Sequence, residues 1–139
     1  MTLYVVDVTV PPDTPRESPV EYEVEVWEEV IVSLECHFPL GCRGKVYTAV
    51  YYGEEQLFPR PFGVYLRGDG ETIKWEEYYE LPHVPCVLRI RAWSPGTLYP
   101  HTIIWRLNAL PRNIAKWWTN IVSMLNLISL AYSFFARRG

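Results

Sequence analysis

Alternation of apolar and polar residues predicts extended strands along most of the chain. The clearest example begins at Val20, where apolar residues (Val20, Tyr22, Val24 and Val26) alternate with Glu21, Glu23 and Glu25. Side chains two residues apart share a face of a strand, so this pattern predicts a strand with one wet face. The alternation resumes over residues 30–38. Because 19 residues are too many for one ordinary strand, we expect a break or bulge near residues 27–29.

Six further segments have an extended pattern. They are residues 3–10, 46–53, 63–67, 72–81, 86–93 and about 101–109. Turns rich in proline and glycine separate them, and Gly68-Asp69-Gly70 is a strong hairpin signal. A parallel α/β fold is excluded because no helical segment falls between the strands. About seven strands at this spacing predict a mainly β protein with an antiparallel sandwich.

Two neighbouring predicted strands resemble a known family. The run Trp75-Glu76-Glu77-Tyr78-Tyr79-Glu80-Leu81-Pro82, followed by Leu88-Arg89-Ile90-Arg91-Ala92-Trp93, resembles strands E and F of immunoglobulin-like or fibronectin-type domains. The resemblance covers about residues 1–109 and implies an immunoglobulin-like sandwich, an architecture common in viral structural proteins and archaeal surface proteins. The family's order of Cys, Trp and Cys is missing, so the resemblance implies architecture and no site. A jelly roll is the alternative arrangement.

The C-terminal segment differs from the rest of the chain. From Trp117 to Ala136 there are 20 residues without a charge, which is the length needed to cross the hydrocarbon core of a bilayer. Pro111 is well placed to begin a helix. We therefore expect a β-sandwich domain over residues 1–109, and a hydrophobic helix within residues 110–139 that acts as a membrane anchor or an oligomerisation element.

The polar residues of this predicted helix form one stripe. At 100° per residue, Thr119, Ser123, Asn126, Ser133 and Arg137 fall within about 80° of one another. The strongly apolar residues contribute about −2 to −5 kcal/mol toward insertion, and the asparagines and serines cancel much of this. The helix can span a membrane, lie in the interface plane, or be buried between its sandwich and a neighbouring subunit. A helix docked on its own sandwich is the fourth arrangement, but one sandwich cannot cover so wide an apolar surface.

Each kind of contact is assigned to particular residues. The apolar contact is assigned to Trp117, Trp118, Ile121, Leu125, Ile128 and Phe135, and helix pairing to Ser123 and Asn126. The basic residues on either side of the uncharged run (Arg112, Lys116, Arg137 and Arg138) are assigned to an anionic surface. The expected partners are copies of the chain, other structural proteins or a lipid membrane. A nucleic acid or a small-molecule substrate is not favoured.

Charge is distributed unevenly along the sequence. Residues 1–80 hold all 16 acidic residues and six basic ones, whereas residues 81–139 hold seven basic residues. One interpretation is a dipolar molecule whose C-terminal half meets an anionic partner. The other is that strands from the two halves interleave in one sandwich and neutralise each other.

The cysteines allow two further hypotheses. Cys36 and Cys42 flank a predicted hairpin tip and could form a disulfide, provided that the geometry allows it. Cys36, Cys42, His83 and Cys86 have the composition of a zinc site, but the spacing between the first two is longer than usual. We therefore expect no metal and no other cofactor.

These observations predict a non-enzymatic structural or assembly protein. The three histidines lie in different segments, and the sequence contains neither a phosphate-binding loop nor a nucleophile elbow. One Gln, four Asn and an excess of Arg over Lys favour a thermophilic archaeon or its virus as the source. A signal peptide is not expected, because Asp7 interrupts the first apolar run. A virion or membrane location is favoured.

The alternative function is a glycan-binding or other ligand-binding module. Sandwiches that bind sugars present planar aromatic side chains on one face. The candidates are Tyr51, Tyr52, Trp75, Tyr78, Trp93 and Tyr99. About half of them are expected in the core, because strand alternation turns every second residue inward.

Overall fold

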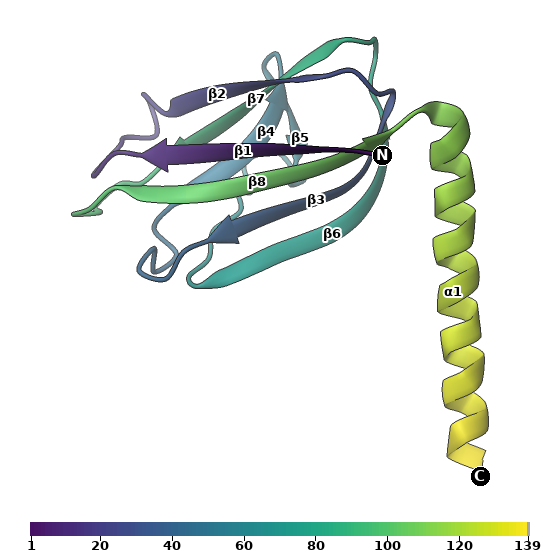
Figure 1. The fold of residues 1–139 in the computed structure, drawn as a ribbon. Coiled ribbons are helices and arrows are strands. Elements are labelled where there is room, and N and C mark those ends of the chain that lie inside the picture. The colour runs from purple at the N-terminus through teal and green to yellow at the C-terminus, as the bar shows by residue number, and fades with distance from the viewer. Residues whose placement is uncertain (139) are drawn as a thin grey trace.

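The computed structural model describes residues 1–138, apart from the side chains of Thr119 and Arg138. Eight strands are followed by one helix (Figure 1). The elements are β1 (Thr2–Val10), β2 (Val20–Val26), β3 (Val30–Phe38), β4 (Tyr47–Tyr52), β5 (Glu55–Phe58), β6 (Glu71–Glu80), β7 (Cys86–Trp93), β8 (His101–Leu110) and α1 (Arg112–Arg138). The predicted mainly β sandwich with a long C-terminal helix is confirmed.

The strands form two antiparallel sheets that pack face to face. Sheet A has the order β1-β8-β3-β6, and sheet B has the order β2-β7-β4-β5. Within them β1 pairs with β8, β2 with β7, β3 with β6 and β4 with β5, which is the nested pairing of a jelly roll. An immunoglobulin-like sandwich would instead place its first two strands side by side. The strand order therefore follows the jelly-roll alternative and not the arrangement implied by the resemblance.

One local expectation is confirmed, one is wrong and one strand was not expected. The break expected near residues 27–29 is present, because the chain passes there from β2 in sheet B to β3 in sheet A. The predicted strand at 63–67 is reduced to one bridge between Thr48 and Leu66. The short strand β5, which follows β4 after a two-residue turn, was not predicted.

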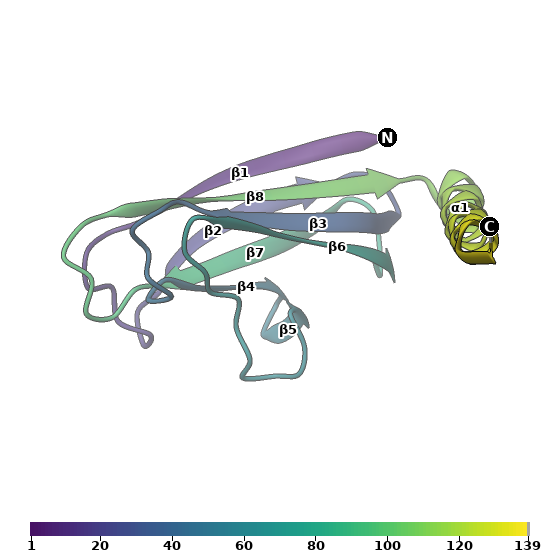
Figure 2. The same ribbon diagram turned by 90° about the horizontal axis from the view of Figure 1, so that it is seen from below.

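The two ends of the sandwich differ in the length of their connections. At the end near α1, residues 27–29, 53–54 and 81–85 connect strands, whereas the far end carries the longer segments 11–19, 39–46, 59–70 and 94–100. Figures 1 and 2 show α1 leaving the near end and running across the direction of the strands. It contacts β3 and β6, and its Ala115 also packs near Leu110 at the end of β8.

A buried tryptophan joins the two sheets. Trp105 of β8 is fully buried, and its indole Nε1 donates a hydrogen bond of 3.0 Å to the Thr48 hydroxyl of β4. That hydroxyl donates in turn to the carbonyl oxygen of Arg91 at 2.9 Å. Because each buried polar atom in this chain of bonds has a partner, the sandwich closes without the desolvation cost of an unpaired group.

Replacing this indole should destabilise the whole sandwich. We expect Trp105→Phe to lower the free energy of unfolding by about 1–3 kcal/mol, because the Thr48 hydroxyl loses a donor and the core loses volume. Urea unfolding followed by far-UV circular dichroism measures the change. Trp27→Phe is the matched control, since Trp27 is exposed and its replacement should change stability by less than about 0.5 kcal/mol. Equal stability of the two variants would contradict the role of Trp105.

Candidate functional site

The base of α1 is fixed to the near end of the sandwich. Ala115 is fully buried and packs in a small cluster with Val30, Val32 and Leu110. The N–H group of Ala115 donates to the carbonyl oxygen of Pro111 at 2.8 Å. Pro111 therefore begins the first turn, as the sequence predicts, and the fixed φ of proline suits that position.

A glutamate and an arginine reinforce this junction. Glu29 Oε1 accepts a hydrogen bond of 3.3 Å from the backbone N–H of Arg112, which satisfies one of the free donors at the start of a helix. The Arg112 guanidinium lies 3.5 Å from carboxylate oxygens of both Glu29 and Glu80. These exposed ion pairs contribute little stability, but together with Ala115 they set the direction in which α1 leaves.

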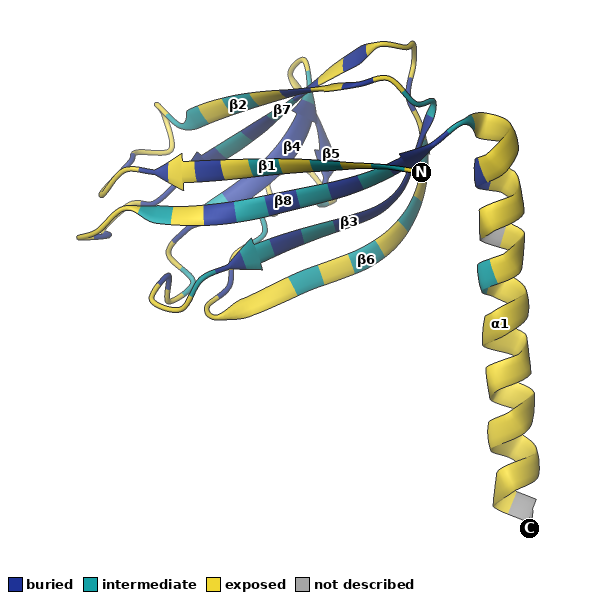
Figure 3. Ribbon diagram, viewed as in Figure 1, coloured by how far each residue is buried: buried dark blue, intermediate teal, exposed yellow. Residues whose placement is uncertain are grey.

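Beyond its first turns α1 is exposed to solvent. Trp117 is 73% exposed, Leu125 59% and Phe135 69%, and Figure 3 shows exposed residues along almost the whole length of the helix. The remaining residues assigned to the apolar contact (Trp118, Ile121 and Ile128) are exposed as well. The structure therefore contradicts a helix docked along its own sandwich, because the sandwich fills its core with its own strands. By length and composition α1 could cross a membrane, and none of its apolar window is buried.

The apolar and polar sides of α1 have defined directions relative to the sandwich. Ala115 marks the side that touches the sandwich. At about 100° per residue, Asn126, Ser133 and Arg137 lie within about 40° of Ala115 around the helix axis, whereas Trp117, Ile128 and Phe135 lie about 140–160° away. The polar stripe is therefore on the sandwich side, where it is interrupted by Val122 and flanked by Trp118 and Leu130, and the broad apolar side faces away. Ser123 is exposed at the edge of the stripe, and helix pairing through Ser123 and Asn126 stays a prediction.

Ion pairs explain the uneven distribution of charge. Acids of the first 80 residues pair with basic residues that follow them: Glu21 and Glu54 with Arg91, Glu23 with Arg89, Glu35 with Arg106, and Glu29 and Glu80 with Arg112. The interpretation that interleaved strands neutralise each other is confirmed for these residues. Arg112 is therefore occupied within the chain and is not a free contact for an anionic surface. Lys116 and Arg137 are exposed, and the side chain of Arg138 lies outside the described part of the structure.

The structure does not contain the predicted disulfide. Cys36, Cys42 and Cys86 are all free and buried; Cys36 and Cys86 lie on strands, Cys42 lies in the loop that follows β3, and all three belong to the main core cluster. Burial raises the pKa of each of the three thiols, so each stays protonated at neutral pH. The zinc hypothesis also fails on geometry, since Cys42 lies at the far end of the sandwich and His83 at the near end.

A pocket on the outer face of sheet B gathers aromatic and charged side chains. We call it the outer-face pocket. It has a volume of about 590 Å³ and is lined by Arg16, Glu17, Pro19, Glu21, Tyr51, Glu54, Phe62, Tyr65, Arg91 and Trp93. The register between β2 and β7 explains part of the lining of this pocket, because Glu21 of β2 lies opposite Arg91 of β7. The long segment between β5 and β6 supplies Phe62 and Tyr65.

Arg91 organises one side of the outer-face pocket. Its Nε donates to Glu21 at 2.8 Å and its terminal nitrogen donates to Glu54 at 3.2 Å, while the guanidinium lies 4.6 Å from the centre of the Tyr51 ring. Partial burial alone would lower the pKa of Arg91, but the hydrogen bond to Glu54 and the charge of Glu21 outweigh it and raise that pKa. Burial raises the pKa of Tyr51, so its ring stays neutral beneath the cation.

Aromatic rings and a second arginine form the other side. Trp93 stacks on Tyr47 at 6.0 Å and meets the edge of Tyr65 at 4.6 Å. Arg16 donates to the Tyr65 hydroxyl at 2.7 Å and lies 5.2 Å from the centre of that ring. Phe62, at the rim, is 79% exposed. The pocket therefore offers ring faces beside both donors and acceptors.

The predicted glycan-contacting residues separate into several groups. Tyr51 and Trp93 meet in the outer-face pocket. Trp75 packs edge-on against the buried ring of Trp105. Tyr52 forms a hydrogen bond with His83 at the near end of the sandwich, and Tyr99 lies in a loop at the far end. Tyr78 is exposed on β6. Phe62 and Tyr65 were missed, because their segment resembles a short strand in the sequence and its fold-back depends on distant residues.

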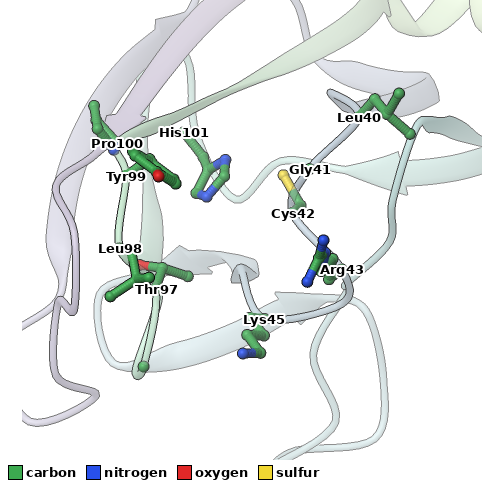
Figure 4. Close-up of a pocket in the computed structure, with 11 residues that line it drawn as sticks. Leu40, Gly41, Cys42, Arg43, Lys45, Thr97, Leu98, Tyr99, Pro100 and His101 are labelled. Carbon is green, nitrogen blue, oxygen red and sulfur yellow. The ribbon is translucent and has the colours of Figure 1, made fainter.

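A second cavity of about 500 Å³ opens at the far end. Figure 4 shows Cys42, Arg43 and Lys45 of the β3–β4 loop on one side, and Thr97, Leu98 and Tyr99 of the β7–β8 loop on the other. The loops that form it are held by carboxylates, since Asp69 accepts from the N–H of Gly41 and Asp13 from the N–H of Gly96, each at 2.7 Å.

Comparison with known proteins gives only remote structural likeness. No family model and no curated protein matches the sequence. A designed double-stranded β-helix is 22% identical, with 76% of this chain and 99% of that chain covered and a TM-score of 0.37. A subunit of disulfide-linked pili from Bacillus endospore appendages is 11% identical (78% and 86% covered, TM-score 0.41). A chain of the infectious bursal disease virus Gx strain is 10% identical (76% and 32% covered, TM-score 0.31). Because these scores are low, function must be argued from the residues of this chain.

The thiols provide a direct check on the corrected disulfide. A folded sample at pH 8 without reductant should react slowly with a thiol reagent such as dithionitrobenzoate, because the buried cysteines have raised pKa values. Denaturation should release three reactive thiols per chain, matching the three cysteines of the sequence. A count of one thiol after denaturation would show that two cysteines are bridged.

Proposed function

We propose that this protein is a non-catalytic structural domain attached to a lipid membrane, with α1 lying in the membrane interface and the jelly roll standing on its polar side. The observation that supports this most directly is the direction of the apolar side of α1, which is exposed and faces away from the sandwich. The hydrogen bonds of two histidines are consistent with a structural role, because His37 bonds Thr72 and His83 bonds Tyr52.

The size of the apolar side requires a partner. Residues 117–136 are uncharged, and at 1.5 Å per residue they extend about 30 Å. Soluble monomers rarely expose contiguous apolar patches larger than a few hundred Å². The side with Trp, Leu, Ile and Phe is suited to the boundary between headgroups and acyl chains, whereas the polar side has hydroxyls and amides with cations only at the helix ends. Binding would therefore depend mainly on the apolar side and not on the strongly cationic face typical of interfacial helices.

Two features favour a helix in the interface plane over a spanning helix. Asn126 lies midway along the uncharged run, and an amide at the bilayer centre opposes insertion. In addition, the start of α1 lies beside the near ends of β3 and β6, and the rest of the helix runs on past the sandwich, across the direction of the strands (Figures 1 and 2). If α1 spanned the bilayer from Trp117 onward, the edge of sheet A would be brought toward the hydrocarbon core of the membrane. If α1 lies in the interface plane, the sandwich stays in water.

A second copy of the chain is the other candidate for covering this surface. The same apolar side could pack against a neighbouring α1, with Ser123 and Asn126 pairing across the interface. In either case the protein would suit a virion or cell-surface structure, and the amide-poor composition supports a thermophilic archaeal source.

Two substitutions on opposite sides of α1 should distinguish these arrangements. Ile128 and Asn126 are two residues apart, so they lie about 160° apart around the helix and at nearly the same position along it. For an interfacial helix, Ile128→Asp should weaken binding to phosphatidylcholine–phosphatidylglycerol vesicles by at least about 2–3 kcal/mol. Asn126→Asp should bind almost as the parent chain does. Vesicle flotation of the full chain measures both.

The remaining outcomes each contradict this arrangement. A comparable loss for both variants indicates a spanning helix, since a charge at the bilayer centre costs about 2.5–3.5 kcal/mol from either side. Failure of the parent chain to float, with a concentration-dependent oligomer in light scattering that Ile128→Asp dissociates, indicates assembly between copies. A monodisperse monomer that does not bind vesicles contradicts both.

A further inference from the structure

We propose that the outer-face pocket binds a neutral saccharide. This site lies on sheet B, whereas α1 contacts β3 and β6 of sheet A. The inference therefore goes beyond membrane attachment and does not depend on it.

The charges of the pocket favour a neutral ligand. Two arginines (Arg16 and Arg91) stand beside three glutamates (Glu17, Glu21 and Glu54), and Arg91 already bonds two of the carboxylates. An anionic ligand would have to displace Glu21 or Glu54 from Arg91. A cationic ligand would have to displace Arg91 from these two glutamates. Hydroxyl groups can donate to a carboxylate and accept from a guanidinium at once, so a polyol can join the network without breaking it.

The aromatic residues favour a ring-shaped polyol. The buried rings of Tyr51 and Trp93 and the more exposed Phe62 line the pocket together with Tyr65, which meets Trp93 edge-on at 4.6 Å. Sugar rings have an apolar C–H face and a polar hydroxyl edge, so they match a site where ring faces adjoin charged donors and acceptors. Phe62 stands out because its ring is 79% exposed although it lies at the rim of a polar pocket. A ligand that covers this ring would remove it from water.

The wall of the pocket is held in place before any ligand arrives. The amide of Gln56 on β5 donates to the carbonyl oxygens of Pro59 and Val64, each at 2.7 Å, and accepts from the N–H of Gly63 at 3.2 Å. These bonds tie down both sides of Phe62. Thr48 and Leu66 exchange two backbone hydrogen bonds of 3.0 Å, which fixes Tyr65 from its C-terminal side. A preorganised wall lowers the entropy lost on binding.

The test uses the full chain and defined oligosaccharides. The neutral probes are cellohexaose, mannohexaose and N-acetylchitohexaose, and the charged comparison is a hexamer of galacturonic acid. The detergent must lack a sugar headgroup, because a glycoside detergent would itself be a probe. Calorimetric titration gives affinity, and the indole N–H resonance of Trp93, assigned with Trp93→Phe, reports the location.

We expect at least one neutral hexasaccharide to bind saturably at or below millimolar concentration and to shift the Trp93 resonance. Phe62→Ala and Glu54→Ala alter exposed side chains, so the fold should survive, and each should weaken binding about two- to tenfold. Tyr99→Ala, which removes an exposed aromatic ring at the far end, is the matched control and should bind as the parent does.

Three results would overturn the proposal. The first is that no neutral probe binds. The second is that binding is unchanged in both pocket variants or is lost equally in Tyr99→Ala. The third is that the galacturonate hexamer binds more tightly than every neutral probe, because the pocket would then select an anion.

Discussion

The rest of the structure depends on how completely sheets A and B bury each other's facing sides. Trp105 crosses from sheet A to bond Thr48 of sheet B, and the surrounding strands fill the remaining space with fully buried aliphatic side chains. A core closed in this way has no groove into which a long helix could pack. The exposed apolar side of α1 follows from this constraint, because Ala115 and its three neighbours are the small contact left at the edge of the sandwich.

The arrangement of strands in the two sheets also determines which acidic and basic residues form pairs. Each sheet places one strand from the basic part of the chain between two strands from the acidic part, β8 between β1 and β3 and β7 between β2 and β4. Glu21 therefore faces Arg91, and Glu35 faces Arg106, across neighbouring strands. Pairs on a wet sheet face contribute modestly to stability, but they bring Arg89, Arg91 and Arg106 of the basic part next to acids of the first 80 residues. Arg112 belongs to this pattern as well, and its two glutamates direct the helix. Attraction to an anionic surface then depends on Lys116 and Arg137.

The individual elements could be predicted from the sequence because they have local causes. Alternation at Val20–Val26 places a strand within two residues of its observed bounds, and Pro111 together with the end of the uncharged run at Ala136 does the same for the helix. The strand order could not be predicted in this way, since an immunoglobulin-like sandwich and a jelly roll both need antiparallel strands with the same period. β5 was missed because four residues are too short to establish a period. The disulfide was predicted from spacing, whereas the direction in which Cys36 points depends on the register of β3.

For the candidate sites too, individual residues could be predicted from the sequence, but their arrangement in space could not. The exposed residues of α1 follow from its composition, but the direction of its apolar side requires the junction at Ala115. Tyr51 and Trp93 could be named as aromatic candidates, and Glu21 and Arg91 as charged residues of two predicted strands. Their meeting depends on register, and the wall above them depends on Gln56, whose side chain holds a segment with no periodic pattern. Long-range pairing is the information that a single sequence lacks.

The position of the two sites relative to each other bears on how the molecule could work. With α1 in the interface plane and its polar side toward the sandwich, the strands stand away from the membrane, because α1 crosses their direction at the near end (Figure 1). The outer-face pocket then opens sideways, parallel to the membrane, and not toward it. A ligand there would leave α1 accessible to lipid, and a neighbouring copy on the same membrane could present its own pocket beside the first. Lateral spacing of membrane-bound copies would therefore determine whether one extended saccharide could bridge them.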